Sequence, residues 1–124
     1  MRLILDTHIL LWWWGDSADL SPRLRELIAD PDHEVLVSAV SIVEIAIKRS
    51  IGRLVVDDDF AAEVEREGFV ELPLTAVHAG RVAELPLLHR DPFDRMLVAQ
   101  AQVEAVPLVT MDEAVRRYDV TTLP

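Results

Sequence analysis

Short apolar segments alternate with segments of helical periodicity along this chain, and this alternation narrows the choice of fold. Residues 2–5 and 34–38 are apolar runs of strand length, and residues 69–72, 107–110 and 120–122 continue the series. Strands without regular polar alternation, separated by helices, are typical of a parallel sheet that is covered on both faces. The sequence therefore predicts an α/β domain with a mainly parallel central sheet flanked by helices.

Capping residues, together with Gly or Pro residues that end helices, mark the helical segments between these strands. Ser21-Pro22 combines a capping hydroxyl with a proline at the first helical position. Ser41 is expected to cap the next helix, and in a later helix Val77 is expected to face the core. The predicted helices after the one at Ser21 span residues 41–50, 57–67, 75–85, 91–104 and 112–117.

The composition excludes several classes of protein. Hydrophobic residues make up 51% of the 124 residues, which is enough for one packed core and excludes an intrinsically disordered chain. The chain is too short for two ordinary domains, so residues 1–124 are expected to form one domain. The absence of cysteine excludes disulfide scaffolds, thiolate zinc sites and cysteine nucleophiles.

The N-terminal segment does not have the pattern of an export signal. Asp6 and His8 interrupt its apolar run before a hydrophobic region of about 7–15 residues can form. The longest unbroken apolar run, residues 9–14, is far shorter than the roughly 20 residues that span a bilayer. We therefore expect a cytoplasmic protein without a membrane segment.

Four carboxylates occupy positions where α/β folds place ligand chemistry. These positions are the carboxyl ends of strands and the first turn of the helix that follows. The four residues are Asp6, Glu44, Asp94 and Asp112. Because the carboxyl ends of parallel strands meet at one edge of a sheet, the sequence predicts that the four side chains converge there.

Three of these carboxylates could instead serve as helix caps. Ser41 and Glu44 have the spacing of a capping box. Asp91 and Asp94 approximate the same pattern, and Asp112 could cap the helix that follows it. Such caps stabilise a protein by about 0.5–2 kcal/mol and require no further function.

The surroundings of Asp6 and Glu44 favour a metal site. Asp6 directly follows an apolar strand and has no Lys or Arg near it in the sequence, and Glu44 lies among apolar neighbours. A carboxylate in such surroundings is costly unless a cation compensates it. Mg²⁺ or Mn²⁺ would relieve the repulsion among converging carboxylates, because both ions prefer oxygen ligands. Such a cation activates water for attack on a phosphodiester, so no protein nucleophile is required.

Four segments surround these carboxylates and together span nearly the whole chain. They read LDTH at residues 5–8, VSAVSIVEI at 37–45, HRDPFDRMLVAQA at 89–101 and VTMD at 109–112. In this order they resemble the PIN-domain nucleases, in particular the VapC-type toxins of toxin–antitoxin pairs. The resemblance implies a single PIN-like domain and a metal-dependent endoribonuclease that a cognate VapB-like antitoxin holds inactive.

The resemblance also implies roles for individual residues. The catalytic and metal-binding carboxylates would be Asp6, Glu44, Asp94 and Asp112, with Mg²⁺ or Mn²⁺ as the cofactor. Thr7 and Thr110 would give polar support, and Asp91 would be a helix cap. The protein would act on RNA as a homodimer or within a larger toxin–antitoxin assembly. The RNA sequence that is cleaved does not follow from the resemblance.

The net charge of −10, from 22 acidic and 12 basic residues, argues against a general basic surface for nucleic acid. Metal ions at the acidic site and local arginines would reconcile this charge with an RNA substrate. The candidates for phosphate contacts are Arg49, Arg90 and Arg95, followed by Arg53, Arg116, Arg117, His8 and His89.

Three consecutive tryptophans, Trp12, Trp13 and Trp14, form a second unusual feature. Consecutive residues of a helix point about 100° apart, so one face cannot bury all three rings. At least one ring is expected near the surface. It could cover a loop, line a docking groove for an antitoxin segment, or form a dimer contact.

Other classes of protein fit the sequence less well. A phosphorelay receiver domain needs paired acidic residues after the first strand and a lysine after the last, whereas Thr7-His8 follow Asp6 and the only lysine is Lys48. An aspartyl phosphatase needs a second Asp two residues after Asp6, whereas this position is His8. A non-catalytic interaction domain that has lost its metal site is a further alternative, and the presence of all four carboxylates argues against it.

Overall fold

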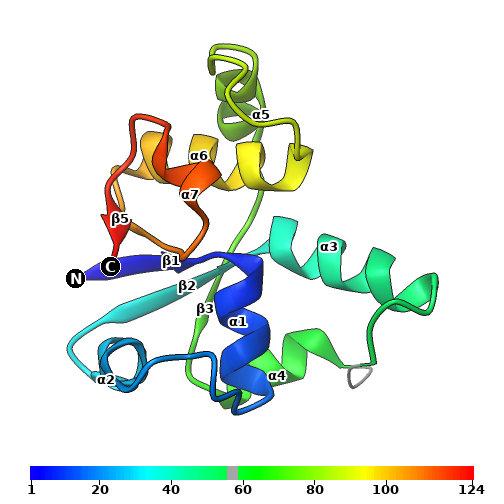
Figure 1. Cartoon of the computed structure of the whole chain (residues 1–124), viewed down its shortest axis with the longest axis vertical. Coiled ribbons are helices and arrows are strands. Elements are labelled where there is room, and N and C mark those ends of the chain that lie inside the picture. Colours follow the sequence, from blue (N-terminus) through cyan, green and yellow to red (C-terminus); the bar gives the residue numbers. More distant parts are fainter. Residues whose placement is uncertain (56–58) are drawn as a thin grey trace.

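The computed structural model of the chain describes residues 1–55 and 59–124. Within these ranges five strands form one sheet in which every neighbouring pair is parallel. From one edge to the other the order is β3 (Val70–Leu72), β2 (Glu34–Ser38), β1 (Arg2–Leu5), β4 (Leu108–Val109) and β5 (Thr122–Leu123). Figure 1 labels β1, β2, β3 and β5. The predicted α/β fold with a parallel central sheet is confirmed.

Seven helices in the described residues surround this sheet. They are α1 (Thr7–Trp14), α2 (Pro22–Ala29), α3 (Ala39–Ser50), α4 (Phe60–Arg66), α5 (Ala76–Val82), α6 (Pro92–Glu104) and α7 (Glu113–Arg116). The predicted start of α4 at Asp57 lies outside the described residues, and the cap of α4 is Asp59, which accepts the N–H of Ala62 at 3.0 Å. None of the helices in the described part of the chain is long and apolar enough to cross a membrane.

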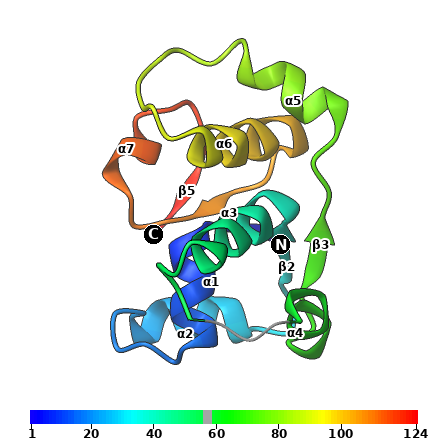
Figure 2. The same ribbon diagram turned by 90° about the vertical axis from the view of Figure 1, so that its right-hand side faces the viewer.

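Helices cover both faces of the sheet (Figures 1 and 2), which explains why its strands are apolar throughout. Successive side chains of a strand point to opposite faces. Leu3 and Leu5 of β1 therefore join one core with α1, α2 and α4, while Ile4 joins another with α6 and α7. Val35 and Leu36 of β2 divide between the two cores in the same way.

The connection pattern of the sheet creates a crevice between β1 and β4. The chain forms β1, β2 and β3 in succession toward one edge and then returns to place β4 on the other side of β1. Connections that diverge from neighbouring parallel strands leave a crevice at the carboxyl ends of those strands. Asp6 directly follows β1 and Thr110 directly follows β4, so the predicted site begins in this crevice.

The start of α3 corrects one sequence prediction. The helix begins at Ala39, and its cap is Ser38, whose hydroxyl accepts the N–H of Val40 at 3.0 Å. The predicted capping box of Ser41 and Glu44 is therefore wrong. Ser41 lies inside the first turn of the helix because β2 passes directly into α3 without a connecting loop.

The orientation of α5 corrects a second prediction. Val77 is 67% exposed, so its predicted inward position is wrong. The helix buries His78 instead, which forms a reciprocal capping box with Thr75 and contacts Glu104 of α6 at 2.8 Å. The buried polar side chain, rather than the apolar one, sets the rotation of this short helix.

Candidate metal centre

Asp6 is fixed at the end of β1 by the two elements that meet there. Its Oδ1 accepts the N–H of Ile9 at 2.8 Å, which makes Asp6 the cap of α1. Its Oδ2 accepts a hydrogen bond from the hydroxyl of Thr110. The side chain is buried, and this burial raises the pKa of Asp6, while the bonds from Thr110 and Ile9 act in the opposite direction. Asp6 is therefore a desolvated carboxyl whose orientation is set by α1 and β4.

Thr110 links Asp6 to Asp112. The Thr110 hydroxyl donates to Asp6 and accepts the N–H of Asp112 at 3.0 Å. Asp112 caps α7 by accepting the N–H of Ala114 at 2.8 Å, so its predicted capping role is present. After burial, the charge of Asp112 is a smaller cause that raises the pKa of Asp6. Thr110 thus has the neighbours that its predicted supporting role requires.

Glu44 lies on α3 and is only 5% exposed. The Nζ of Lys48, one helical turn later, donates to Oε2 of Glu44 at 2.7 Å. The buried Oε1 of Glu44 has no hydrogen-bond partner among the described residues. Buried carboxylate oxygens normally have a partner. One oxygen of Glu44 is therefore balanced by lysine, and the other is available to a cation.

Asp94 occupies the first turn of α6 but does not cap it. The cap is Asp91, whose Oδ1 accepts the N–H groups of Phe93 at 2.8 Å and Asp94 at 3.2 Å. The Oδ2 of Asp94 lies 2.9 Å from Nε2 of His89. Burial raises the pKa of Asp94 to about 6 against the opposing effect of His89.

The four predicted carboxylates form one electrostatic network. After burial, the charge of Asp112 is a further cause that raises the pKa of both Asp6 and Asp94, and Glu44 acts on Asp94 in the same way. Asp6 and Asp112 also line a hollow of about 210 Å³ beside Trp12. A donor set dominated by carboxylate oxygens, with a buried oxygen lacking a partner, fits Mg²⁺ or Mn²⁺. The structure thus links the four carboxylates electrostatically, and their shared metal site and catalytic role remain predictions.

Thr7 connects two of the elements that carry these carboxylates. Its hydroxyl donates to Oγ of Ser41 at 3.0 Å, and both side chains are buried. This bond joins α1, which Asp6 caps, to α3, which carries Glu44. Thr7 therefore acts on the site through the packing of α1 against α3.

Arg95 uses its guanidinium group inside the protein. It donates to the carbonyl oxygens of Pro86 at 3.0 Å and Val82 at 3.2 Å, and to the hydroxyl of Tyr118 at 3.0 Å. These bonds tie the segment that precedes α6 to the C-terminal part of the chain. These hydrogen bonds give Arg95 a structural role. Contact of Arg95 with an RNA phosphate remains a prediction.

The other two main arginine candidates differ in their surroundings. Arg49 lies over the ring of Phe60, with its Cζ 5.9 Å from the ring centroid. Arg90 is exposed directly after His89 and is close in sequence to Asp94. Contacts of Arg49 and Arg90 with RNA remain predictions, and the exposure of Arg90 directly after His89 favours Arg90.

The three tryptophans of α1 are all half-buried, as the geometry of a helix requires for consecutive residues. They line separate hollows. Trp12 borders the hollow at Asp6, and Trp13 donates its Nε1 to Glu67 at 3.1 Å. Trp14 lines a groove of about 380 Å³ between α1 and α4, which also includes Phe60. A single groove for all three rings is therefore not observed, and the role of Trp14 in docking remains a prediction.

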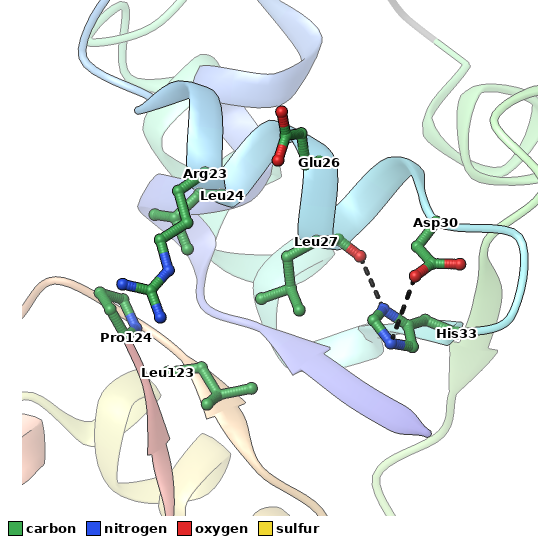
Figure 3. A pocket seen from close by; sticks show the side chains of 8 residues that line it. All are labelled: Arg23, Leu24, Glu26, Leu27, Asp30, His33, Leu123 and Pro124. Carbon is green, nitrogen blue, oxygen red and sulfur yellow. Dashed lines mark hydrogen bonds and ion pairs between the residues drawn. The ribbon is translucent and has the colours of Figure 1, made fainter.

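A hollow of about 270 Å³ lies away from the acidic network, between α2 and β5 (Figure 3). Arg23 extends from α2 toward Pro124, as Figure 3 shows. His33 contacts the carbonyl oxygen of Leu27 at 2.8 Å and lies 3.8 Å from the carboxylate of Asp30. The charged side chains here are of both signs, and none of the four predicted carboxylates lines this hollow.

Lys48 is a part of the site that the sequence did not identify, and the contact of His89 with Asp94 is another. The spacing of Glu44 and Lys48 on one helix is a signal that predicts such a pair. His89 stands among the predicted phosphate contacts, whereas the structure places it against Asp94. Its segment has no regular spacing, so local patterns give no signal for that contact.

Comparisons with known proteins identify the family and the fold. A family model described as the PIN domain matches residues 3–120. A chain of the structure of VapBC2 from Rickettsia felis bound to a promoter DNA fragment has 16% identity and a TM-score of 0.71, with 99% of this chain and 98% of that chain covered. A chain of FitAcB from Neisseria gonorrhoeae has 19% identity and a TM-score of 0.61, with coverage of 98% and 96%.

A third solved structure, VapBC-1 from nontypeable Haemophilus influenzae, has 14% identity and a TM-score of 0.61, with coverage of 99% and 97%. Comparison with curated proteins gives no match. At these identities the similarity to solved structures concerns the fold.

Proposed function

Since this chain belongs to the PIN domain family, we propose that it is a metal-dependent endoribonuclease and the toxin of a toxin–antitoxin pair. The observation that carries the proposal is the electrostatic network that links the four carboxylates, together with the unpartnered buried oxygen of Glu44. Residues 1–124 would form a single nuclease domain. The solved structures with this fold include VapBC and FitAB complexes, which supports the assignment as a toxin.

The cofactor in this proposal is Mg²⁺ or Mn²⁺. The residues that would hold it are Asp6, Glu44, Asp94 and Asp112. When bound, the cation supplies the positive charge that activates water and stabilises the leaving oxygen during hydrolysis of an RNA phosphodiester. Carboxylates are suited to this task because they leave part of the coordination sphere to water.

The chain itself contributes orientation and a low-dielectric environment. Thr110 and the N–H of Ile9 hold the two oxygens of Asp6, so the carboxylate does not reorient when the substrate arrives. Lys48 balances one oxygen of Glu44. Arg90, which is exposed beside the network, would attract the RNA phosphates.

We also propose a cognate VapB-like antitoxin as the partner and a homodimer or larger complex as the assembly. An apolar surface supports this part of the proposal. Val43 and Ile47 on α3, and Ile51 at its C-terminal cap, are exposed at helical spacing. The groove beside Trp14 is lined by Leu54 and Val55, which follow that helix. Such a surface is typical of protein interfaces. Because the proposed antitoxin and RNA substrate would both meet this protein inside the cell, we propose the cytoplasm as its location.

Cleavage of labelled RNA by the purified protein tests this function. We expect cleavage with Mg²⁺ or Mn²⁺, no cleavage with EDTA, and none by the Asp94→Asn variant. Asp91→Ala is the matched control, because Asp91 caps α6 and lies next to the site. Expression should also inhibit growth, and co-expression of a short adjacent reading frame should relieve that inhibition. Cleavage that persists in EDTA, or in Asp94→Asn, would contradict the proposal.

A further inference from the structure

His89 lies inside the acidic network rather than at its border. Its Nε2 is 2.9 Å from Oδ2 of Asp94. One ligand atom from each of His89, Asp94 and Asp112 lies within 4.8 Å of the others. This group therefore combines one imidazole nitrogen with two carboxylates, whereas the predicted site contains oxygen donors alone.

The separation of His89 and Asp94 suits two neighbouring ligands of one cation. In an octahedral site with metal–oxygen distances of about 2.0–2.1 Å, adjacent donor atoms lie roughly 3 Å apart. The 2.9 Å between Nε2 and Oδ2 matches this spacing. The two atoms therefore need little movement to share a cation. The cation would replace the hydrogen that lies between them, and the neutral imidazole would then carry its proton on Nδ1.

The main chain around His89 is held in place from outside the acidic network. The hydroxyl of Tyr118 accepts the N–H of His89 at 3.0 Å and donates to its carbonyl oxygen at 3.4 Å. Arg95 donates to the same hydroxyl at 3.0 Å. Tyr118 is buried. A side chain on such a fixed backbone loses little freedom on binding a metal.

We propose that His89 is a nitrogen ligand of the divalent cation, together with Asp94 and Asp112. This inference rests on the proposed metal-dependent function, because it assumes that the carboxylates hold a cation. Imidazole favours transition metals, whereas sites with oxygen donors alone suit Mg²⁺. A ligand at His89 therefore makes the site bind Mn²⁺ in preference to Mg²⁺.

The alternative role for His89 is to orient Asp94 by donating a hydrogen bond from Nε2. His89→Gln separates the two roles. Its side-chain amide can still donate to Asp94, but its nitrogen does not coordinate a metal. The bonds from Tyr118 reach only main-chain atoms of residue 89, so the variant should keep the local fold. Thermal unfolding of the metal-free variant checks this point.

Pulsed electron paramagnetic resonance of bound Mn²⁺ gives a direct test, because it detects a directly coordinated nitrogen. The wild-type protein should show this nitrogen coupling, and His89→Gln should lose it. His8→Gln is the matched control, because His8 lines the hollow at Asp6 and is the other histidine close to the carboxylates. The control should keep the coupling.

Calorimetric titration with Mn²⁺ and Mg²⁺ provides the second measurement. His89→Gln should lower the affinity for Mn²⁺ by about tenfold or more and change the affinity for Mg²⁺ much less. Mn²⁺ that binds without nitrogen coupling, or coupling that disappears in His8→Gln alone, would overturn the role of His89 and leave the nuclease proposal intact. If wild-type protein bound neither ion, both proposals would fail.

Discussion

At the level of single residues, burial determines which carboxylates of the proposed metal centre have raised pKa values. Burial is the largest cause of the raised pKa of both Asp6 and Asp94. The charge of Asp112 adds to both shifts. Without a cation, the folded protein therefore keeps carboxylates close together in a place where their charged forms are unfavourable. Removing one of these charges should stabilise the metal-free protein.

Asp94→Asn is expected to stabilise the metal-free protein while abolishing RNA cleavage. The pKa of Asp94 is about 6 in the folded protein, above its ordinary value of 3.8. Folding therefore favours the protonated carboxyl of Asp94. The stability that this preference contributes is fully present below about pH 4, and it is lost as the pH rises through about 6 and the carboxyl of the folded protein ionises. Urea unfolding in EDTA at about pH 7.5 should show a gain of about 1–2 kcal/mol for the variant. The gain should disappear near about pH 4.

Asp91→Ala is the control for this measurement, because Asp91 accepts the N–H groups that begin α6. This variant should lose about 1 kcal/mol of stability and keep its RNA cleavage. A loss of similar size in Asp94→Asn, in place of a gain, would show that Asp94 has a structural role in the first turn of α6.

Lys48→Met is expected to destabilise the metal-free protein by about 2 kcal/mol. The substitution removes the cation that lies 2.7 Å from Oε2 of Glu44, and it leaves a buried carboxylate with neither oxygen paired. Added Mn²⁺ should then raise the melting temperature of the variant more than that of the wild type. Glu44→Gln in the same background should restore most of the lost stability. Equal stability of Lys48→Met and wild type would contradict a compensating role for Lys48.

At the level of elements, a buried polar contact fixes α3 against α6. The hydroxyl of Ser38 donates to Oε1 of Gln100 at 2.5 Å and accepts the N–H of Val40. Nε2 of Gln100 donates to the carbonyl oxygen of Pro73 at 3.3 Å. These bonds join the end of β2, the start of α3 and the middle of α6. Since α3 carries Glu44, the contact also sets the distance between carboxylates on the two helices.

Gln100→Leu should therefore affect both stability and metal affinity. We expect a loss of about 2 kcal/mol, because the buried hydroxyl of Ser38 and the carbonyl of Pro73 lose their partners. Binding of Mn²⁺ should weaken in calorimetric titration. Gln102→Leu, on the same helix but with an exposed hydrogen bond to Asp119, should change stability by only about 0.5 kcal/mol. If the two variants behaved alike, the buried contact would not couple α3 to α6.

The kinds of element follow from local patterns in the sequence, whereas some of their details depend on tertiary contacts. The strands are recognisable because burial on both faces makes them apolar throughout. The cap of α3 is Ser38, whereas the sequence predicted Ser41. Both serines follow the same apolar run, so the local pattern could not distinguish between them. The helical spacing of apolar residues predicts that Val77 faces the core. The contact between His78 and Glu104 determines the rotation of α5 instead, and it leaves Val77 exposed.

At the level of the whole molecule, the site depends on contacts between distant parts of the chain. Thr110 donates to Asp6 across 104 residues, and no local pattern predicts such a pair. The four carboxylates could nevertheless be proposed from the sequence, because Asp6 and Asp112 follow recognisable strands and Asp94 begins a recognisable helix. Glu44 lies further into α3 than the sequence predicted, because that helix begins at Ala39. The order of the strands, and hence the crevice between β1 and β4, follows only from the assembled sheet. Lys48, the only lysine, lies on α3 beside Glu44, whereas a receiver domain needs a lysine after its last strand.

The net charge of −10 and the acidic centre predict how a proposed antitoxin would inhibit the enzyme. An inhibitory segment should bring an apolar anchor for the groove beside Trp14 and at least one Arg or Lys that replaces the metal among the carboxylates. Inhibition would then be partly an electrostatic competition with the cation. Binding should weaken at high salt, and saturating Mg²⁺ should oppose the antitoxin.

Calorimetric titration of the purified pair across salt and Mg²⁺ concentrations tests this competition. Trp14→Ala should weaken the complex by about 2 kcal/mol or more, because it removes a large ring from the groove, and it should leave RNA cleavage by the free enzyme nearly unchanged. Trp13→Ala is the comparison, since Trp13 lines a different hollow and is bonded to Glu67. An affinity that is indifferent to salt and Mg²⁺, with Trp14→Ala binding normally, would rule out this mode of inhibition and leave the nuclease assignment unaffected.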